Sequence, residues 1–145
     1  QEAKRLEMDS TTYTNPHGLS EKDHLSTAGD LAKLAFTALG NPMFADYVST
    51  RERGVVVRGS SGYQRNVIWK NTTQLLAIQG YEGVKTGTTS KAGACLASVC
   101  FREDRKLLLV VLGSSSSSSR YTDSRNLYRW AWLNLTGFND EMGDH

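Results

Sequence analysis

The chain has few residues of the kinds that mark specialised sequence classes. Its 145 residues include only two cysteines and two prolines, which excludes a disulfide-stapled scaffold and a proline-rich or collagen-like segment. The 17 basic and 15 acidic side chains give a net charge of +2 and form no basic run, so we predict no nucleic-acid partner. The longest apolar run, residues 107–112, is far shorter than the roughly 20 residues that cross a bilayer.

The two cysteines, Cys95 and Cys100, are five residues apart in one predicted strand. An odd separation puts their side chains on opposite faces, so we predict that they do not pair and are buried free thiols. No grouping of cysteines, histidines and carboxylates has the spacing of a zinc site. We therefore expect no metal and no cofactor.

A capping pattern predicts that a helix begins just after Thr27. The Thr27 hydroxyl is expected to accept from the Asp30 amide, and the Asp30 carboxylate to accept from the Thr27 amide in return. Apolar residues then follow at helical spacing, and Gly40 is expected to end the helix in a left-handed conformation. An asparagine–proline pair directly after it predicts a second helix over residues 43–50.

The middle of the chain has the composition of β-strands. Residues 55–57 and 64–70 flank a Gly-Ser-Ser-Gly turn, which predicts a hairpin. Two more strands are predicted over residues 94–102 and 106–113, and the unbroken apolar run in the second indicates a strand buried on both faces. Helices packed on an antiparallel sheet, an α+β fold, follow from this order of elements.

The end of the chain is predicted to be helical and then irregular. A helix over residues 122–135 carries Leu, Tyr and Trp on more than one side and should lie against the sheet. Residues 139–145 form an acidic tail, and residues 1–138 are expected to belong to one domain.

The sharpest feature is the phrase Y-E-G-V-K-T-G-T-T over residues 81–89. Lys85 and Thr86 offer a fixed charge and a directional donor to a carboxylate, and Gly87 lacks the Cβ that would block close approach to the backbone. The Thr88 amide is then expected to point at an oxyanion. Three letters also occur by chance, and an ordinary turn with a solvated lysine is the alternative.

Five phrases in order resemble those of the low-molecular-mass penicillin-binding proteins, the serine D-alanyl-D-alanine carboxypeptidases. Together they cover the chain to about Trp132. They are G-V-K-T-G-x-T-x-x-A-G-x-C-L at 83–96, N-P-x-G-L at 15–19, H-x-S-T-A-x-D-L-A at 24–32, N-x-N-x-L-L at 71–76 with Thr73 in place of the second Asn, and a closing strand and helix with Arg120, Asp123 and Trp130.

The resemblance implies a β-lactamase/transpeptidase-like fold and an extracytoplasmic enzyme acting on peptidoglycan stem peptides and β-lactams. In that family the serine of an S-x-x-K element attacks the carbonyl of a terminal D-Ala-D-Ala peptide. The resemblance implies that Lys85 and Thr86 bind the terminal carboxylate and that the Thr88 amide forms half of the oxyanion hole. His17, in a Pro-Gly loop, is a candidate for the rim of the site, with an exposed histidine as the alternative.

The sequence departs from the family in having no S-x-x-K anywhere. Its one hydroxyl-x-x-lysine runs from Thr88 to Lys91, and Thr88 cannot be both nucleophile and part of the anion cradle. Ser124 begins an S-x-N by letter, but within the predicted last helix, where a surface patch is expected. We expect a complementary amino-terminal segment, upstream of Gln1, that carries S-x-x-K and S-x-N.

The sequence is compatible with two main functions. The chain is either the substrate-binding half of a serine D-Ala-D-Ala carboxypeptidase or a non-catalytic binding or structural remnant of the same fold. A class A β-lactamase ranks lower, because no E-x-x-L-N segment is present to position a deacylating water.

Overall fold

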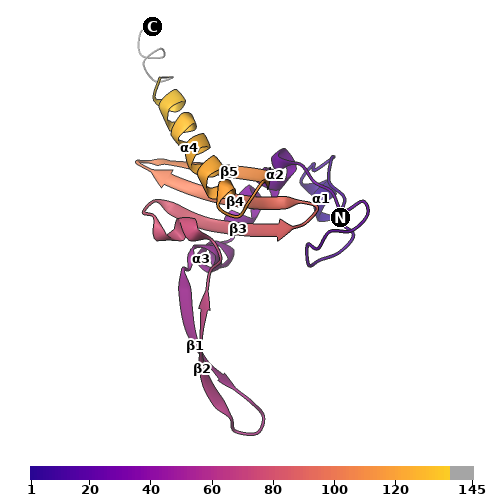
Figure 1. The fold of residues 1–145 in the computed structure, drawn as a ribbon, viewed down its shortest axis with the longest axis vertical. Helices are drawn as coiled ribbons and strands as arrows, with labels where there is room; N and C mark the ends of the chain where they lie inside the picture. The colour runs from indigo at the N-terminus through magenta and orange to yellow at the C-terminus, as the bar shows by residue number, and fades with distance from the viewer. Residues whose placement is uncertain (138–145) are drawn as a thin grey trace.

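The computed structural model describes residues 1–137, and the predicted acidic tail lies outside the described residues. Helices precede a long hairpin, a three-stranded sheet follows, and a long helix comes last (Figure 1). Antiparallel sheets flanked by helices confirm the predicted α+β class. The elements are α1 (Glu2–Arg5), α2 (Ala28–Leu39), α3 (Pro42–Ser49), β1 (Glu52–Arg58), β2 (Gln64–Lys70), the 3-10 helix η1 (Gln74–Ala77), β3 (Tyr81–Thr89), β4 (Gly93–Arg102), β5 (Arg105–Ser114) and α4 (Ser119–Gly137).

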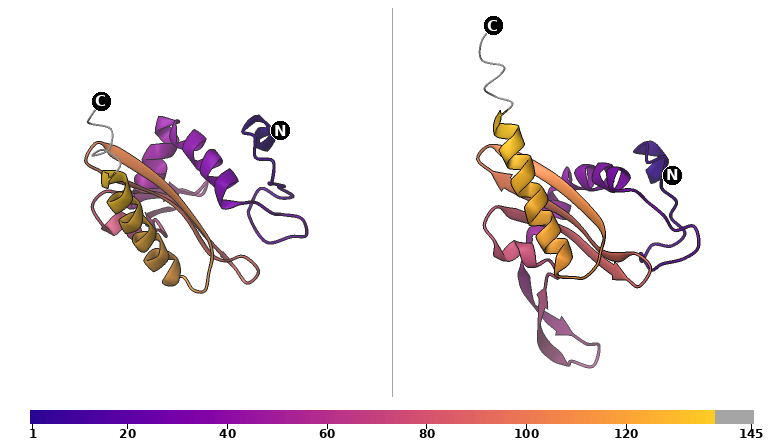
Figure 2. Two further views of the ribbon diagram at one scale, coloured as in Figure 1. Left: turned by 90° about the horizontal axis from the view of Figure 1, so that it is seen from above. Right: turned by 45° about the horizontal axis from the view of Figure 1, so that its top comes forward.

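The main sheet has the antiparallel order β3-β4-β5, with Thr86 opposite Leu96 and Leu96 opposite Val111. Helix α4 covers one face, and α2 and α3 lie on the other (Figure 2). Leu75, Leu96 and Tyr121 form a core cluster on which Tyr81 packs. Strand β3, which carries the K-T-G residues, therefore forms a free edge of the sheet.

Helix α2 begins after Thr27 as predicted, but the Asp30 carboxylate has other hydrogen-bond partners than the sequence indicated. Thr27 Oγ1 accepts from the Asp30 amide at 3.2 Å. The Asp30 carboxylate does not return to Thr27; it accepts from Thr11 Oγ1 at 2.7 Å and from the Ser10 amide at 3.1 Å. The reciprocal bond was a wrong prediction, because a loop 20 residues away supplies two donors to this buried carboxylate.

The junction between α2 and α3 also differs from the prediction. Gly40 has φ −67° and is right-handed, so the predicted left-handed cap is wrong. The chain turns directly into α3, because Asn41 caps it by accepting from the Met43 and Phe44 amides at 3.0 and 3.2 Å. A left-handed residue is not needed where a second helix starts at once.

The predicted hairpin is confirmed and leaves the body of the molecule as a long arm (Figures 1 and 2). Its strands are mostly exposed; only Val55 and Val67, which face each other, are half-buried. Asn71 fastens its root, since its Nδ2 donates to the Val48 and Thr50 carbonyls at 3.2 and 3.3 Å.

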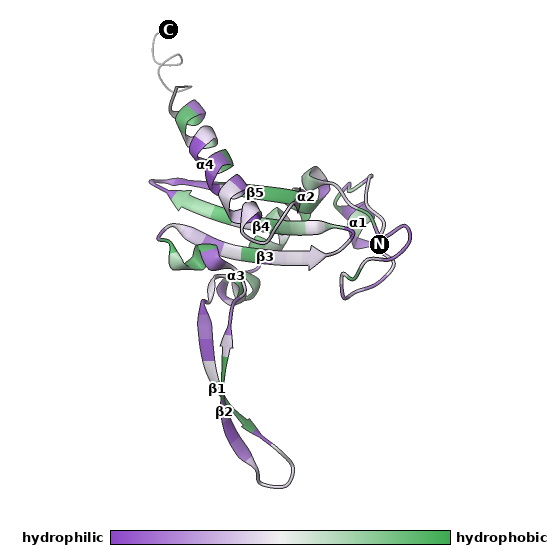
Figure 3. Ribbon diagram, viewed as in Figure 1, coloured by the Kyte–Doolittle hydropathy of each residue, from purple (hydrophilic) through white to green (hydrophobic). Residues whose placement is uncertain are grey.

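Strand β5 and helix α4 are less buried than the sequence indicated. In β5 only Val111 and Ser114 are buried, and Leu112 is 40% exposed, so full burial of this apolar strand (Figure 3) was a wrong prediction for this chain. Tyr121 and Tyr128 of α4 are buried, as predicted for a helix that lies against the sheet, while Trp130 is 65% exposed. Within residues 1–137, no helix is both long and apolar enough to span a bilayer.

Candidate active site

The K-T-G residues open onto a cavity of about 660 Å³. This cavity lies between the sheet, helices α2 and α3, and the loop around His17. Its wall is apolar where Leu31, Leu34 and Val110 line it and polar along β3. All of the predicted site residues, Lys85, Thr86, Gly87, Thr88 and His17, line this one cavity.

Lys85 and Thr86 differ in how firmly they are held. Lys85 is exposed, and its ammonium donates to the Thr86 carbonyl. Thr86 is buried, and its hydroxyl shares a hydrogen bond of 2.7 Å with the hydroxyl of Thr72. The arrangement combines a movable cation with a fixed hydroxyl at the same end of a cavity. Sequence reasoning assigned no role to Thr72; the one available signal was its place in the N-x-N-x-L-L phrase at 71–76, just before the K-T-G strand.

Two glycines of β3 have opposite environments. Gly83 has φ +76°, and a Cβ there would lie 2.6 Å from the Val48 carbonyl oxygen, so packing requires glycine. A Cβ on Gly87 would meet no atom within 4 Å, and the backbone at Gly87 is not left-handed. Neither conformation nor packing within this chain explains a glycine at position 87, which leaves its bare backbone available to a ligand.

The side chain of Arg120, at the start of α4, contacts the K-T-G strand. Its guanidinium donates to Thr88 Oγ1 at 3.0 Å and to the Gly87 carbonyl at 3.2 Å, and it lies over the Tyr121 ring. The side chain is buried, and its Nε has no hydrogen-bond partner. Arg120 does not pair with Asp123, which accepts from Ser114 Oγ at 2.6 Å. The sequence placed Arg120 only in the closing strand and helix, because a contact across 32 residues leaves no periodic signal.

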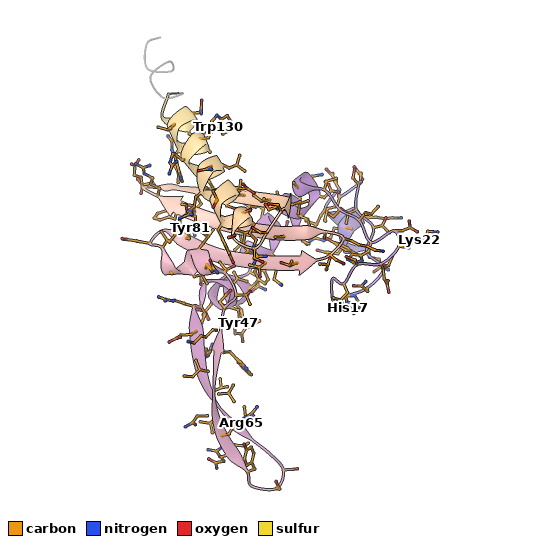
Figure 4. The ribbon with its side chains drawn as sticks, in the orientation of Figure 1. His17, Lys22, Tyr47, Arg65, Tyr81 and Trp130 are labelled. Carbon is orange, nitrogen blue, oxygen red and sulfur yellow. The ribbon has the colours of Figure 1, made fainter. Side chains whose placement is uncertain are left out.

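The His17 loop is fastened to the end of β3. Ser20 Oγ and Thr89 Oγ1 lie 2.6 Å apart, which ties the loop to the strand. Within the loop, Asn15 Oδ1 accepts from the Gly18 amide at 2.8 Å, and His17 Nδ1 accepts from the Leu19 amide at 3.2 Å. His17 is thus an exposed residue at the cavity rim beside the end of β3 (Figure 4).

The remaining candidates from the sequence take no part in the substrate binding expected of the K-T-G residues. Ser124 is fully buried, and its Oγ donates to the Arg120 carbonyl at 2.7 Å, so the predicted surface patch is wrong for this residue, although Arg125 and Asn126 of the same S-x-N are exposed. Cys95 and Cys100 are free, as predicted, although Cys95 is only half-buried and lines the cavity. His24 Nδ1 accepts from the Thr14 amide at 3.1 Å. Among residues 1–137, no cluster of three or more metal-ligating side chains is present.

Comparison with known proteins identifies the family that the chain resembles. The profile of the family described as D-alanyl-D-alanine carboxypeptidase matches residues 1–116. D-alanyl-D-alanine carboxypeptidase DacD of Escherichia coli K12 is 32% identical over 136 residues, which are 92% of this chain and 33% of DacD. DacC of the same strain is 30% identical over 131 residues, 90% of this chain and 31% of DacC.

Solved structures extend the similarity to the fold. The Streptomyces K15 DD-transpeptidase superposes with a TM-score of 0.87 at 29% identity, over 91% of this chain and 51% of that one. Penicillin-binding protein D2 of Listeria monocytogenes, in its cefotaxime-bound form, gives 0.73 at 29%, over 88% and 51%. The chain thus spans about a third of these curated relatives and about half of these solved chains. The matched profile, the ordered motifs and the β-lactamase-like fold together establish that the chain belongs to the D-alanyl-D-alanine carboxypeptidase family.

Proposed function

We propose that this chain is the substrate-binding half of a serine D-Ala-D-Ala carboxypeptidase that trims peptidoglycan stem peptides. Residues 1–138 would be the carboxy-terminal portion of its penicillin-binding, transpeptidase-like domain, followed by the acidic tail at 139–145. The observation that carries the proposal is Gly87, a glycine on an edge strand that this chain's own packing does not require, beside a cation and a fixed hydroxyl.

The K-T-G strand would hold the end of the substrate. Lys85 and the Thr86 hydroxyl bind the terminal carboxylate through charge-assisted hydrogen bonds. The Thr88 backbone amide donates to the oxyanion, and Gly87 lets the substrate backbone approach. Arg120, by its bonds to Thr88 Oγ1 and the Gly87 carbonyl, keeps the strand in position and adds positive charge beneath it.

The nucleophile would come from a complementary amino-terminal segment with S-x-x-K and S-x-N. Its serine attacks the carbonyl of the penultimate D-alanine, its lysine takes the proton, and the peptide C–N bond breaks as D-alanine leaves with that proton. Water then cleaves the acyl ester. A β-lactam would acylate the same serine by opening its ring, in keeping with the cefotaxime-bound Listeria relative.

The second candidate is a binding remnant without chemistry, favoured by the absence of S-x-x-K from all 145 residues. The free edge of β3 and the half-buried β5 support the first candidate, because such surfaces are normally covered in a stable domain. A substrate in the cell wall places the proposed site of action outside the cytoplasmic membrane.

A fluorescent penicillin tests the proposal. The protein carrying this chain together with its S-x-x-K segment is incubated with the label and examined by intact mass spectrometry. We expect one covalent adduct, on the serine of that segment. If no adduct forms, and this chain alone binds a D-Ala-D-Ala peptide in a Lys85-dependent way, the chain is a binding remnant without catalytic activity.

A further inference from the structure

A second concave surface lies at the root of the hairpin arm. This root groove, of about 540 Å³, separates α3 from β1 and β2, and Figure 4 shows Tyr47 where the arm leaves the body. Two aromatic rings line it and are largely exposed, Tyr47 at 59% and Trp69 at 61%. Arg53 and Asn71 also line the groove, as do Lys70 and Glu52, which lie opposite each other on the other face of the hairpin.

The register of the hairpin sorts its side chains into two unlike faces. Arg53 lies opposite Trp69, Val55 opposite Val67 and Val57 opposite Arg65. Opposed residues, and those two positions along, share one face of a hairpin. The face that meets the root groove is therefore an apolar and aromatic strip with a guanidinium at each end.

Several polar groups of the root groove have no partner in the described chain, whereas Asn71 and Thr50 donate to backbone carbonyls. Within residues 1–137, no hydrogen bond or ion pair engages the Arg53 guanidinium, the Lys70 ammonium, the Tyr47 hydroxyl or the Trp69 indole. Residues 51–70 contain five Arg and Lys side chains and one Glu. The arm thus presents cations and ring faces together, which suits an anionic ligand with flat apolar faces.

The root groove and the K-T-G cavity share no lining residue, but adjacent residues connect them. Asn71 lines the groove, and the next residue, Thr72, contacts the Thr86 hydroxyl at 2.7 Å. A ligand bound to both surfaces would pass along the Asn71–Thr72 segment.

We propose that the root groove binds the part of the peptidoglycan polymer that lies away from the scissile bond, the amino-sugar chain with its acidic peptide stem. This inference rests on the proposed function and names a subsite for its polymeric substrate. Sugar rings present C–H faces that stack on Trp69 and Tyr47, and stem carboxylates pair with Arg53, which shares the face of Trp69. A short D-Ala-D-Ala peptide ends before the groove and gains nothing from it.

The experiment compares polymer with short peptide in the protein that carries this chain and its S-x-x-K segment. Trp69→Ala and Arg53→Ser are the test variants. Trp130→Ala and Arg129→Ser are matched controls on α4, Trp130 being 65% exposed against 61% for Trp69. Three readouts are taken: sedimentation with insoluble peptidoglycan after penicillin has blocked the serine, D-alanine release from glycan-linked peptide, and D-alanine release from a short peptide.

We expect Trp69→Ala to weaken sedimentation and to lower kcat/KM on glycan-linked peptide about tenfold, the loss typical of a binding anchor. Penicillin acylation and short-peptide hydrolysis should stay within about twofold, and both controls should behave like the unmodified protein. Equal losses on polymer and short peptide would mean that the groove is an internal packing contact and overturn the inference, as would no loss on either. Failure of the unmodified protein to be acylated would instead refute the proposed function. Sedimentation would still show whether the root groove binds peptidoglycan.

Discussion

Gly83 and Gly87 lie four residues apart on β3, and packing requires a glycine at position 83 but not at position 87. Substitutions at the two positions therefore test the stability of the fold and the proposed function separately, at the scale of single residues. Gly83→Ala forces a Cβ against the Val48 carbonyl at a positive φ. We expect it to lower the free energy of unfolding by about 2–4 kcal/mol, because backbone atoms cannot move aside cheaply.

Gly87→Ala should behave in the contrary way. Its Cβ enters open space, so the free energy of unfolding should change by less than about 0.5 kcal/mol. Penicillin acylation should nevertheless fall at least about tenfold, because the methyl group occupies the approach to the K-T-G backbone. Urea denaturation and labelling rates of the two variants check this, and a destabilised Gly87→Ala with normal acylation would contradict it.

Lys85 provides a second test at this scale. Lys85→Ala removes the charged donor that we propose for the substrate carboxylate, and we expect kcat/KM for D-alanine release to fall about 10- to 100-fold. Lys91→Ala, an exposed lysine in the turn after the strand, is the control and should keep its rate. Equal losses in both variants would show that net positive charge, rather than the position of Lys85, binds the substrate.

At the scale of elements, a buried phenol helps to hold α4 against the sheet. Tyr128 donates to the Ser98 carbonyl at 2.7 Å, and both residues are almost completely buried. Tyr128→Phe leaves that carbonyl without its donor and should cost about 1 kcal/mol in urea denaturation at pH 7. Tyr63→Phe, at the exposed tip of the arm, is the control and should be neutral.

The same phenol makes stability fall at alkaline pH. Burial raises the pKa of Tyr128, while in the unfolded chain it ionises near its ordinary value of about 10. The unfolded state therefore loses the proton first, so stability is fully present below about pH 10 and decreases above it. Urea midpoints from pH 8 to 11 should decrease less steeply in Tyr128→Phe. Some slope should remain, because burial also raises the pKa of Tyr81 and Cys100.

Elements with local signals could be predicted from the sequence, and contacts across many residues could not. The caps Thr27 and Asn41 were read from neighbouring letters and are confirmed. The tie from Asp30 to Thr11 and the reach of Arg120 beneath β3 were missed, because each joins segments at least 19 residues apart. Right-handed Gly40 was missed because the next helix cap, rather than the glycine, decides that turn.

The site was predictable to a similar extent. The K-T-G letters and the ordered phrases led to Lys85 and Thr86 because their chemistry follows from adjacent residue types. Thr72 was missed because a threonine hydroxyl has no motif of its own and matters only through its contact with Thr86.

At the scale of the whole molecule, the chain presents surfaces of a kind that stable domains normally cover. These include the free edge of β3 and the apolar cavity beside it. We expect the chain alone to bind a hydrophobic dye and to self-associate with rising concentration. Adding the S-x-x-K segment should suppress both effects in sedimentation and fluorescence measurements. A monomer that binds no dye and unfolds cooperatively would contradict this.

The exposed side chain of Lys85 on the edge strand also matters during folding, before any substrate is bound. The strands β3, β4 and β5 are neighbours in sequence, so short turns suffice to pair them early in folding. In that interval β3 offers unpaired backbone groups to any other strand, including one from a second copy. A charged lysine on an edge opposes such pairing. The residue proposed to hold the substrate is then also a gatekeeper against aggregation while the protein is being made.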